Sequence, residues 1–139
     1  MAKTEVALAI LHQGDRFLLQ LRDNIPGIVY PGYWGFFGGH LEPGETPEVA
    51  LRREVLEEIR YNISSFTPFK SYEYDDIKRH FFSVPLAVSL DKLVLEEGWD
   101  MDLWTPEEVR RGEKYSVKAG EVRPLGTPHQ QVLLEFIRS

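Results

Sequence analysis

The stretch GHLEPGETPEVALRREVLEEIRY, residues 39–61, joins a loop rich in glycine and proline to the clearest helix signal in the chain. Thr46 can supply the oxygen that caps a helix N-terminus, and Pro47 stands at the first helical position, where its missing N–H costs nothing. Apolar residues then recur at helical spacing as far as Ile59. We therefore expect a helix that opens at Thr46-Pro47 and runs to about Ile59.

Two apolar stripes run along this expected helix. One repeats every four residues and consists of Leu51, Val55 and Ile59. The other lies on a different side and consists of Val49 and Leu56. Two stripes indicate a helix that is packed between layers of the fold, with its charged residues on the remaining surface.

Three carboxylates share a further face of the helix. Glu54, Glu57 and Glu58 stand at positions i, i+3 and i+4, where they repel one another by a few tenths of a kcal/mol per pair. A hard cation would relieve this repulsion, and an all-oxygen site selects Mg²⁺, Mn²⁺ or Ca²⁺ over zinc or copper. Arg53 can tie down Glu57 and can also reach back toward Glu45 in the loop. Taken alone, the same pattern also fits a solvated charged face.

The sequence on either side predicts a mixed α/β domain. Strands are expected in residues 6–11, buried on both faces, in 16–22 after a Gly14-Asp15 turn, in a short piece within 33–37, and in 63–74 and 78–90. Further helices are expected to open at Thr105-Pro106 and Thr127-Pro128, and loops are expected over 23–44 and over the acidic stretch 95–104. This order of elements indicates a mixed sheet with helices on both sides.

Composition limits the class of protein. The chain has 139 residues and a formal net charge of −6, which fits one domain over 1–139 and disfavours general nucleic-acid binding through a broad basic face. It contains no cysteine, so disulfides, thiolate metal sites and a cysteine nucleophile are excluded. The early apolar run of residues 6–11 is too short for a membrane span and lacks a signal-peptide pattern. We expect a cytoplasmic protein without membrane attachment.

The stretch 39–61 resembles the box of the Nudix hydrolase family, which reads G-x5-E-x7-R-E-U-x-E-E-x-G-U with U an aliphatic residue. The residues that occupy their box positions are Gly39, Glu45, Arg53, Glu54, Val55, Glu57 and Glu58. The resemblance implies the family's single-domain α/β/α sandwich, with a mixed β-sheet between helices. It also implies metal-dependent hydrolysis of a diphosphate linkage, with water attacking phosphorus, in a nucleoside diphosphate derivative such as a nucleoside triphosphate or a sugar nucleotide.

Two positions of the box depart from the family pattern. Arg60 stands where the box has its last glycine, and Tyr61 stands where it has an aliphatic residue. The glycine normally lets the helix end in a left-handed turn. Either Arg60 accepts that conformation with some strain, or the helix ends differently and Asn62 adopts it. No carboxylate is lost, so the departure concerns the exit from the helix.

The resemblance assigns roles to the box residues. Glu54 and Glu58 are implied as the first metal ligands, with Glu57 close behind and the Gly38 carbonyl as a backbone ligand. The implied cofactor is Mg²⁺, with Mn²⁺ as a substitute. Gly38 is followed by Gly39, and glycine lets a backbone approach a bound ion closely. Arg53 joins the three carboxylates in the implied catalytic group.

Two assignments lie outside the box. The family often adds an acidic residue from a downstream loop as ligand or general base, and Glu97, just before a glycine, is our candidate, with Glu96 or Asp100 as alternatives. A solvated acidic loop would carry the same residues. Arg22, at the end of the second expected strand, is the cation best placed for a distal phosphate of the substrate, although a solvent-exposed arginine is an equal reading.

Two alternatives to a hydrolase of a small nucleotide remain open from the sequence. A Nudix-fold module that senses or binds a nucleotide without cleaving it is the main one, although such modules commonly lose box carboxylates and this chain keeps them. A processing enzyme for capped RNA ends is disfavoured by the negative charge. The expected partner is a small-molecule nucleotide, and a homodimer is compatible with the sequence. The sequence does not determine which nucleoside diphosphate derivative is bound.

Overall fold

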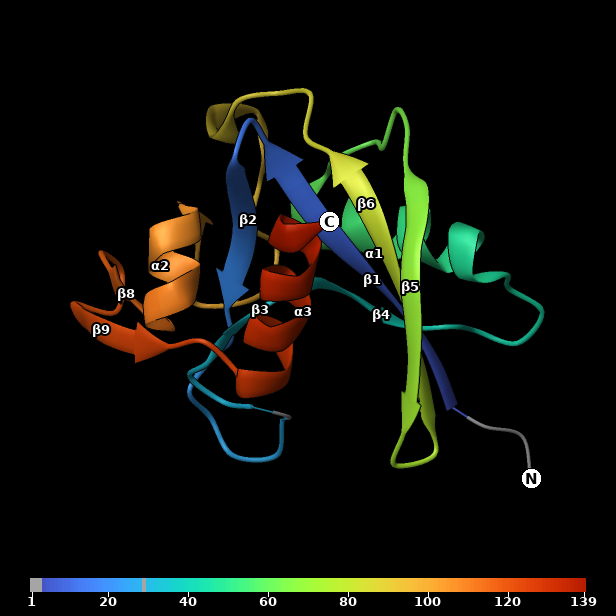
Figure 1. The fold of residues 1–139 in the computed structure, drawn as a ribbon, viewed down its shortest axis with the longest axis horizontal. Helices are drawn as coiled ribbons and strands as arrows, with labels where there is room; N and C mark the ends of the chain where they lie inside the picture. The colour runs from blue at the N-terminus through green and yellow to red at the C-terminus, as the bar shows by residue number, and fades with distance from the viewer. Residues whose placement is uncertain (1–3, 29) are drawn as a thin grey trace. The chain divides into compact units, whose positions relative to one another are not determined.

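The computed structural model describes residues 4–28 and 30–139, and these residues form two compact units. The first unit holds residues 4–12 and 37–96, and the second holds residues 13–28, 30–36 and 97–139. Figure 1 shows the elements of both. The predicted Nudix box, residues 39–61, lies entirely in the first unit.

The first unit is built on a mixed sheet. Its strands are β1 (Thr4–Gln13), β4 (Phe37–His40), β5 (Thr67–Tyr74) and β6 (Ile77–Pro85). β1 runs parallel to β6 and antiparallel to β4, and β5 pairs with β6 in antiparallel orientation. The consecutive residues Ala9, Ile10 and Leu11 are all buried, so β1 is covered on both faces, as the sequence predicted. A 3-10 turn, η1 (Leu90–Lys92), follows this sheet.

The helix α1 (Pro47–Ile59) begins and ends close to the predicted residues. The Thr46 hydroxyl accepts a hydrogen bond from the backbone N–H of Val49 at 3.2 Å, which is the predicted N-cap. The helix packs against β4, and its first apolar stripe is buried at Leu51, Val55 and Ile59.

The prediction that α1 is packed on two sides is wrong. Val49 and Leu56, the second stripe, are 53% and 48% exposed. The helical repeat places these two residues on a different side of the helix from the buried stripe. Burial is therefore concentrated on the stripe of Leu51, Val55 and Ile59.

The second unit combines antiparallel strands with two helices. Its elements are β2 (Arg16–Leu21), β3 (Trp34–Gly35), β7 (Asp100–Trp104), α2 (Pro106–Arg111), β8 (Glu113–Ser116), β9 (Glu121–Pro124) and α3 (Thr127–Arg138). β2 pairs in antiparallel orientation with both β3 and β7, and β8 pairs with β9. Trp34 and Trp104 are fully buried and meet edge to face, with their ring centroids 5.5 Å apart.

Several expectations about loops and caps need correction. The acidic stretch was expected as a loop, yet Asp100–Trp104 is strand β7, because its backbone pairs with β2. Buried Asp100 also accepts hydrogen bonds from the Ser116 hydroxyl and from the Met101 N–H. The expected loop 23–44 ends early, since β4 includes Gly38 and Gly39. The hairpin of β8 and β9 was not predicted. Helix α2 has the predicted Thr105 cap, whereas α3 is capped by Gly126 without a side-chain hydrogen bond.

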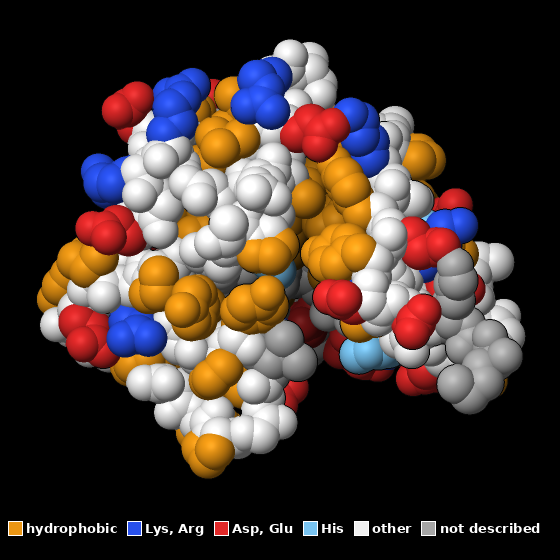
Figure 2. Space-filling model, turned by 60° about the horizontal axis from the view of Figure 1, so that its bottom comes forward, with side chains coloured by type: hydrophobic (Ala, Val, Ile, Leu, Met, Phe, Trp, Pro, Cys, Tyr) orange, Lys and Arg blue, Asp and Glu red, His pale blue; other side chains and the backbone are white. Residues whose placement is uncertain are grey.

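The surface carries charges of both signs. Figure 2 shows one face, on which lysine and arginine side chains are interleaved with acidic ones. No helix of the described residues is long and apolar enough to cross a membrane.

Candidate active site

The carboxylates of α1 lie against the glycine pair of β4. A Cβ atom built on Gly39 would be only 2.6 Å from Cδ of Glu54, so the bare backbone at this position leaves room for the carboxylate. The Glu58 Oε1 atom accepts a hydrogen bond from the backbone N–H of Gly38 at 2.8 Å. The structure therefore brings together the predicted glycines and two of the predicted carboxylates.

Arg53 holds the acidic residues of the box in one network. Its Nε and Nη2 atoms donate to the two carboxylate oxygens of Glu45, at 2.7 and 2.9 Å. Its Nη1 atom donates to Glu54 at 3.0 Å and to Glu57 at 3.3 Å, and Nη2 also donates to the His40 carbonyl at 3.1 Å. The predicted contacts of Arg53 with Glu57 and Glu45 are confirmed. The contact with Glu54 was not predicted, because adjacent residues on a helix do not face each other.

The network separates the pKa values of its carboxylates. The hydrogen bond from Arg53, helped by the backbone N–H of Glu42, lowers the pKa of Glu45 to about 2. Burial raises the pKa of Glu54, and the charges of Glu57 and Glu45 act in the same direction, whereas Arg53 opposes them. An added positive charge beside Glu54 would oppose this rise by stabilising the charged carboxylate.

The lowered pKa of Glu45 predicts a specific acid dependence of stability. Because the pKa falls from 4.5 in the unfolded chain to about 2 in the folded protein, Glu45 stabilises the fold fully above pH 4.5 and loses that contribution as the pH falls toward 2. Urea unfolding should therefore give wild type a higher free energy of unfolding than Glu45→Gln. This difference should be largest at pH 5 and above and should shrink between pH 4.5 and 2. A gap that stays constant over this range would contradict the assignment.

The donor set fits a hard divalent cation. Glu54, Glu57, Glu58 and the Gly38 carbonyl offer only oxygen, which suits Mg²⁺ or Mn²⁺. The desolvated carboxylate of Glu54, lying against the bare Gly39 backbone, is a group that such a cation would stabilise. Within residues 4–28 and 30–139, no three carboxylate or imidazole groups are already drawn together as a metal cluster. Because Arg53 donates a hydrogen bond to Oε1 of Glu54, a cation bound by this carboxylate would compete with Arg53.

The three acids considered outside the box differ in their surroundings. Glu96 forms an ion pair with Arg60, and Asp100 is buried with both oxygens hydrogen-bonded. Glu97 is exposed at the start of the second unit's 97–139 segment, and the described residues give it no ion pair. Of these three acids, Glu97 is therefore the one whose carboxylate is least committed to the fold.

Arg22 is half-buried in the second unit. Its backbone N–H donates to the Tyr33 carbonyl at 3.0 Å, while its side-chain Nε is buried without a hydrogen-bond partner among the described residues. A buried guanidinium N–H without an acceptor costs free energy until an acceptor reaches it. The buried Nε distinguishes Arg22 from an arginine whose guanidinium is fully exposed to solvent.

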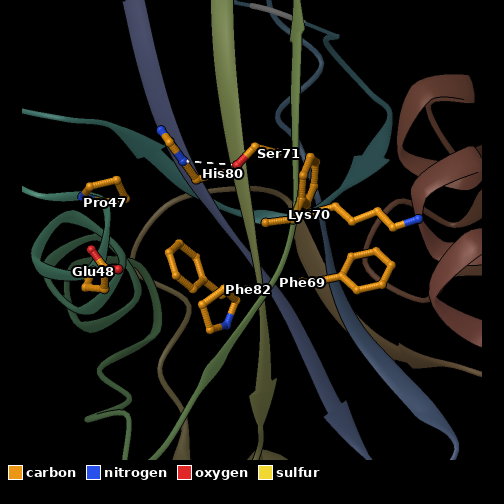
Figure 3. Close-up of a pocket in the computed structure, with 9 residues that line it drawn as sticks. Pro47, Glu48, Phe69, Lys70, Ser71, His80 and Phe82 are labelled. Atoms are coloured by element: carbon orange, nitrogen blue, oxygen red, sulfur yellow. Dashed lines mark hydrogen bonds between the residues drawn. The ribbon is translucent and has the colours of Figure 1, made fainter. Parts of the chain in front are cut away.

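A separate groove of about 320 Å³ lies beside the start of α1 (Figure 3). Pro47 and Glu48 border it on one side and residues of β5 and β6 on the other. His80 and Ser71 line it and are hydrogen-bonded through His80 Nδ1 at 3.3 Å, and His80 Nε2 bonds Glu5, which does not line the groove, at 2.7 Å. Sequence reasoning missed this link because Glu5 lies far from His80 in the chain, and because the register that pairs Ser71 with His80 was not predicted. Glu54, Glu57 and Glu58 do not line this groove.

Comparison with known proteins gives matches in both sequence and fold. The NUDIX domain model matches residues 2–134. The nucleoside triphosphatase NudI of Salmonella schwarzengrund is 42% identical over 69 residues, a match that covers 48% of this chain and 48% of that protein. The chain thus spans about half the length of the curated relatives it matches.

Solved structures share the whole fold. A structure from a study of MutT from Aliivibrio salmonicida and Vibrio cholerae has a TM-score of 0.75 and 19% identity, and the match covers 97% of each chain. The E. coli ORF135 protein has a TM-score of 0.70 and 24% identity, covering 99% of this chain and 91% of that one. The predicted mixed α/β fold class is confirmed. With a family model over nearly its full length and this shared fold, the chain belongs to the NUDIX domain family.

Proposed function

We propose that this protein is a metal-dependent pyrophosphohydrolase that cleaves a diphosphate linkage in a nucleoside diphosphate derivative. The observation that carries the proposal is the half-buried Glu54 carboxylate against Gly39, beside Glu58 bound to the Gly38 N–H and with Arg53 anchored on Glu45. The name of the NudI relatives, nucleoside triphosphatase, makes nucleoside triphosphates the first substrate class to test. The proposal treats residues 1–139 as a single catalytic domain.

The box residues divide the work in this proposal. Glu54, Glu57, Glu58 and the Gly38 carbonyl would hold Mg²⁺ or Mn²⁺. The bound ion would neutralise charge on the phosphate oxygens and so make an acidic protein able to bind an anionic substrate. Arg53 keeps the carboxylates of the last two turns of α1 oriented through its fork to Glu45.

The proposal also assigns roles to two residues of the second unit, each from the contacts of its own side chain. Glu97 is proposed as the general base that takes a proton from the attacking water, because its carboxylate has no competing ion pair among the described residues. Arg22 is proposed to bind a phosphate of the substrate, because its buried Nε lacks an acceptor among the described residues.

A hydrolysis screen tests the function directly. The purified chain would be incubated with nucleoside triphosphates, sugar nucleotides, dinucleotides and dinucleoside polyphosphates in the presence of Mg²⁺, and the products would be identified by mass. We expect cleavage at a diphosphate linkage, with nucleoside triphosphates among the substrates. Nucleotide binding without turnover of any compound would instead identify a silent binding module.

The metal requirement is a separate prediction. Activity should vanish with a chelator and return with Mg²⁺ or Mn²⁺, while Zn²⁺ should substitute poorly because the donors are all oxygen. The measurement is the initial rate after dialysis against chelator and re-addition of each metal. Full recovery with trace Zn²⁺ alone would argue against this ligand set.

Glu97→Gln should lower kcat about 10²- to 10⁴-fold, the range typical of losing a general base, with little change in KM. The matched change Asp100→Asn should act mainly on stability, since Asp100 is buried and hydrogen-bonded to Ser116. Steady-state kinetics and thermal unfolding of both variants separate the two roles. Wild-type kcat in Glu97→Gln would show that another carboxylate serves.

A further inference from the structure

The exit from α1 is built around an arginine in an unfavourable backbone conformation. Arg60 follows the last helical residue with φ 55° and ψ 33°, the left-handed region, and its N–H donates to the Leu56 carbonyl at 2.9 Å. The structure thus resolves the alternatives left by the sequence, since Arg60 itself ends the helix. A residue with a Cβ is strained here, whereas glycine is not. Some compensating contact of the Arg60 side chain is therefore expected.

A segment that follows η1 covers this end of the helix. The Val94 N–H donates to the Ile59 carbonyl at 3.1 Å, and the Glu96 N–H donates to the Glu58 carbonyl at 2.9 Å. These carbonyls belong to the last turn, whose oxygens have no partner within a helix. Leu93, one residue earlier, is buried and anchors the segment. The last turn of α1 is therefore closed by the backbone of residues 94–96.

The Arg60 side chain adds a second connection between the same two elements. Its Nε forms an ion pair with the carboxylate of Glu96. Glu96 thereby binds the end of α1 twice, through its backbone N–H to Glu58 and through its side chain to Arg60. A positive guanidinium beside the C-terminus of a helix is also favoured by the helix dipole.

We propose that Arg60 and Glu96 are positioning residues that fix the last turn of α1, and with it the carboxylates of Glu57 and Glu58. This inference rests on the proposed function, in which those carboxylates act. Glu58 is held at both ends, because its carbonyl accepts from Glu96 and its carboxylate accepts from Gly38. A glycine at this position, as in the family pattern, would have a relaxed backbone but no side chain. Arg60 has a strained backbone, and its side chain forms an ion pair with Glu96 of the 94–96 segment.

The variant Arg60→Gly separates these two effects. Glycine relieves the left-handed strain and keeps the backbone N–H, but it removes the ion pair. The thermal midpoint should therefore stay the same or rise. Exchange of the Val94 and Glu96 amides in the metal-free protein should become about 2- to 5-fold faster, the range expected for an exposed ion pair. Mn²⁺ affinity and kcat should fall by a similar factor, about 2- to 5-fold, with KM little changed.

A second set of variants tests whether the two residues act as a pair. Glu96→Gln leaves the backbone of Arg60 untouched and should reproduce the faster exchange and weaker Mn²⁺ binding. The double variant should be no worse than Arg60→Gly alone, because both changes remove one interaction. The matched control is Glu107→Gln, which removes an exposed glutamate from an ion pair with Arg110 in α2 and should change neither quantity.

The readouts keep this inference distinct from the proposed function. Wild-type protein that hydrolyses no diphosphate would refute the function, whereas amide exchange and Mn²⁺ affinity still test the tie between Arg60 and Glu96. Unchanged exchange at Val94 and Glu96 in Arg60→Gly would overturn the inference. Additive effects in the double variant would overturn it as well.

Discussion

Replacing Glu58 by glutamine should lower kcat at least about 100-fold, a loss of roughly 2.7 kcal/mol of transition-state stabilisation, while the chain stays folded. The substitution removes the negative charge of a proposed metal ligand but keeps the side-chain length. The glutamine carbonyl oxygen can still accept the hydrogen bond that the Gly38 N–H gives to Glu58 at 2.8 Å. The loss should therefore appear in catalysis and in metal affinity rather than in the fold.

The measurement is steady-state kinetics together with thermal unfolding and Mn²⁺ binding. Glu48→Gln is the matched control, since it makes the same change at an exposed residue in the first turn of the same helix. It should leave kcat close to wild type. A Glu58→Gln variant that keeps more than a tenth of wild-type kcat would remove Glu58 from the mechanism.

Replacing Gly38 by alanine should have the largest effect on stability. The φ of Gly38 is 137°, a region that residues with a side chain rarely adopt, and a Cβ there would lie 2.2 Å from the Ala7 carbonyl oxygen of β1. The nearest atoms belong to the β1 backbone, which cannot turn aside as a flexible side chain can. The clash can therefore be relieved only if β4 moves away from β1. We expect a loss of about 3 kcal/mol or more in the free energy of unfolding, and a thermal midpoint lower by about 10 °C.

Gly44→Ala provides the control for backbone strain without a clash. Gly44 also has a positive φ, of 84°, but among the described residues no atom beyond its chain neighbours lies within 4 Å of a Cβ built on it. Its loss should be about 1 kcal/mol, the cost of a left-handed conformation alone. Urea unfolding of both variants gives the comparison. Equal losses at the two positions would mean that the close approach of β4 to β1 is not what requires glycine at residue 38.

The sequence predicted those parts of the site that depend on neighbours along the chain. The start of α1 at Thr46-Pro47 follows from capping chemistry within one turn. The shared face of Glu54, Glu57 and Glu58 and the reach of Arg53 to Glu57 follow from the helical repeat.

Other expectations failed because they depended on residues far away in the chain. Residues 100–104 looked like an acidic loop, yet the pairing of β7 with β2 and the Ser116 hydroxyl on Asp100 make them a strand. The apolar residues Val49 and Leu56 looked like a packing stripe, but periodicity alone does not say which apolar side is covered.

The sequence by itself determined the helix, its carboxylate face and the family pattern, because these arise from spacing and capping over a few residues. Only the tertiary structure decided that Glu54 lies against Gly39, that Glu58 binds the Gly38 N–H and that Arg60 ends α1 tied to Glu96. Each of these contacts joins segments that are distant in sequence. Their geometry depends on how β4 and the 94–96 segment pack on α1, and no local propensity encodes that packing.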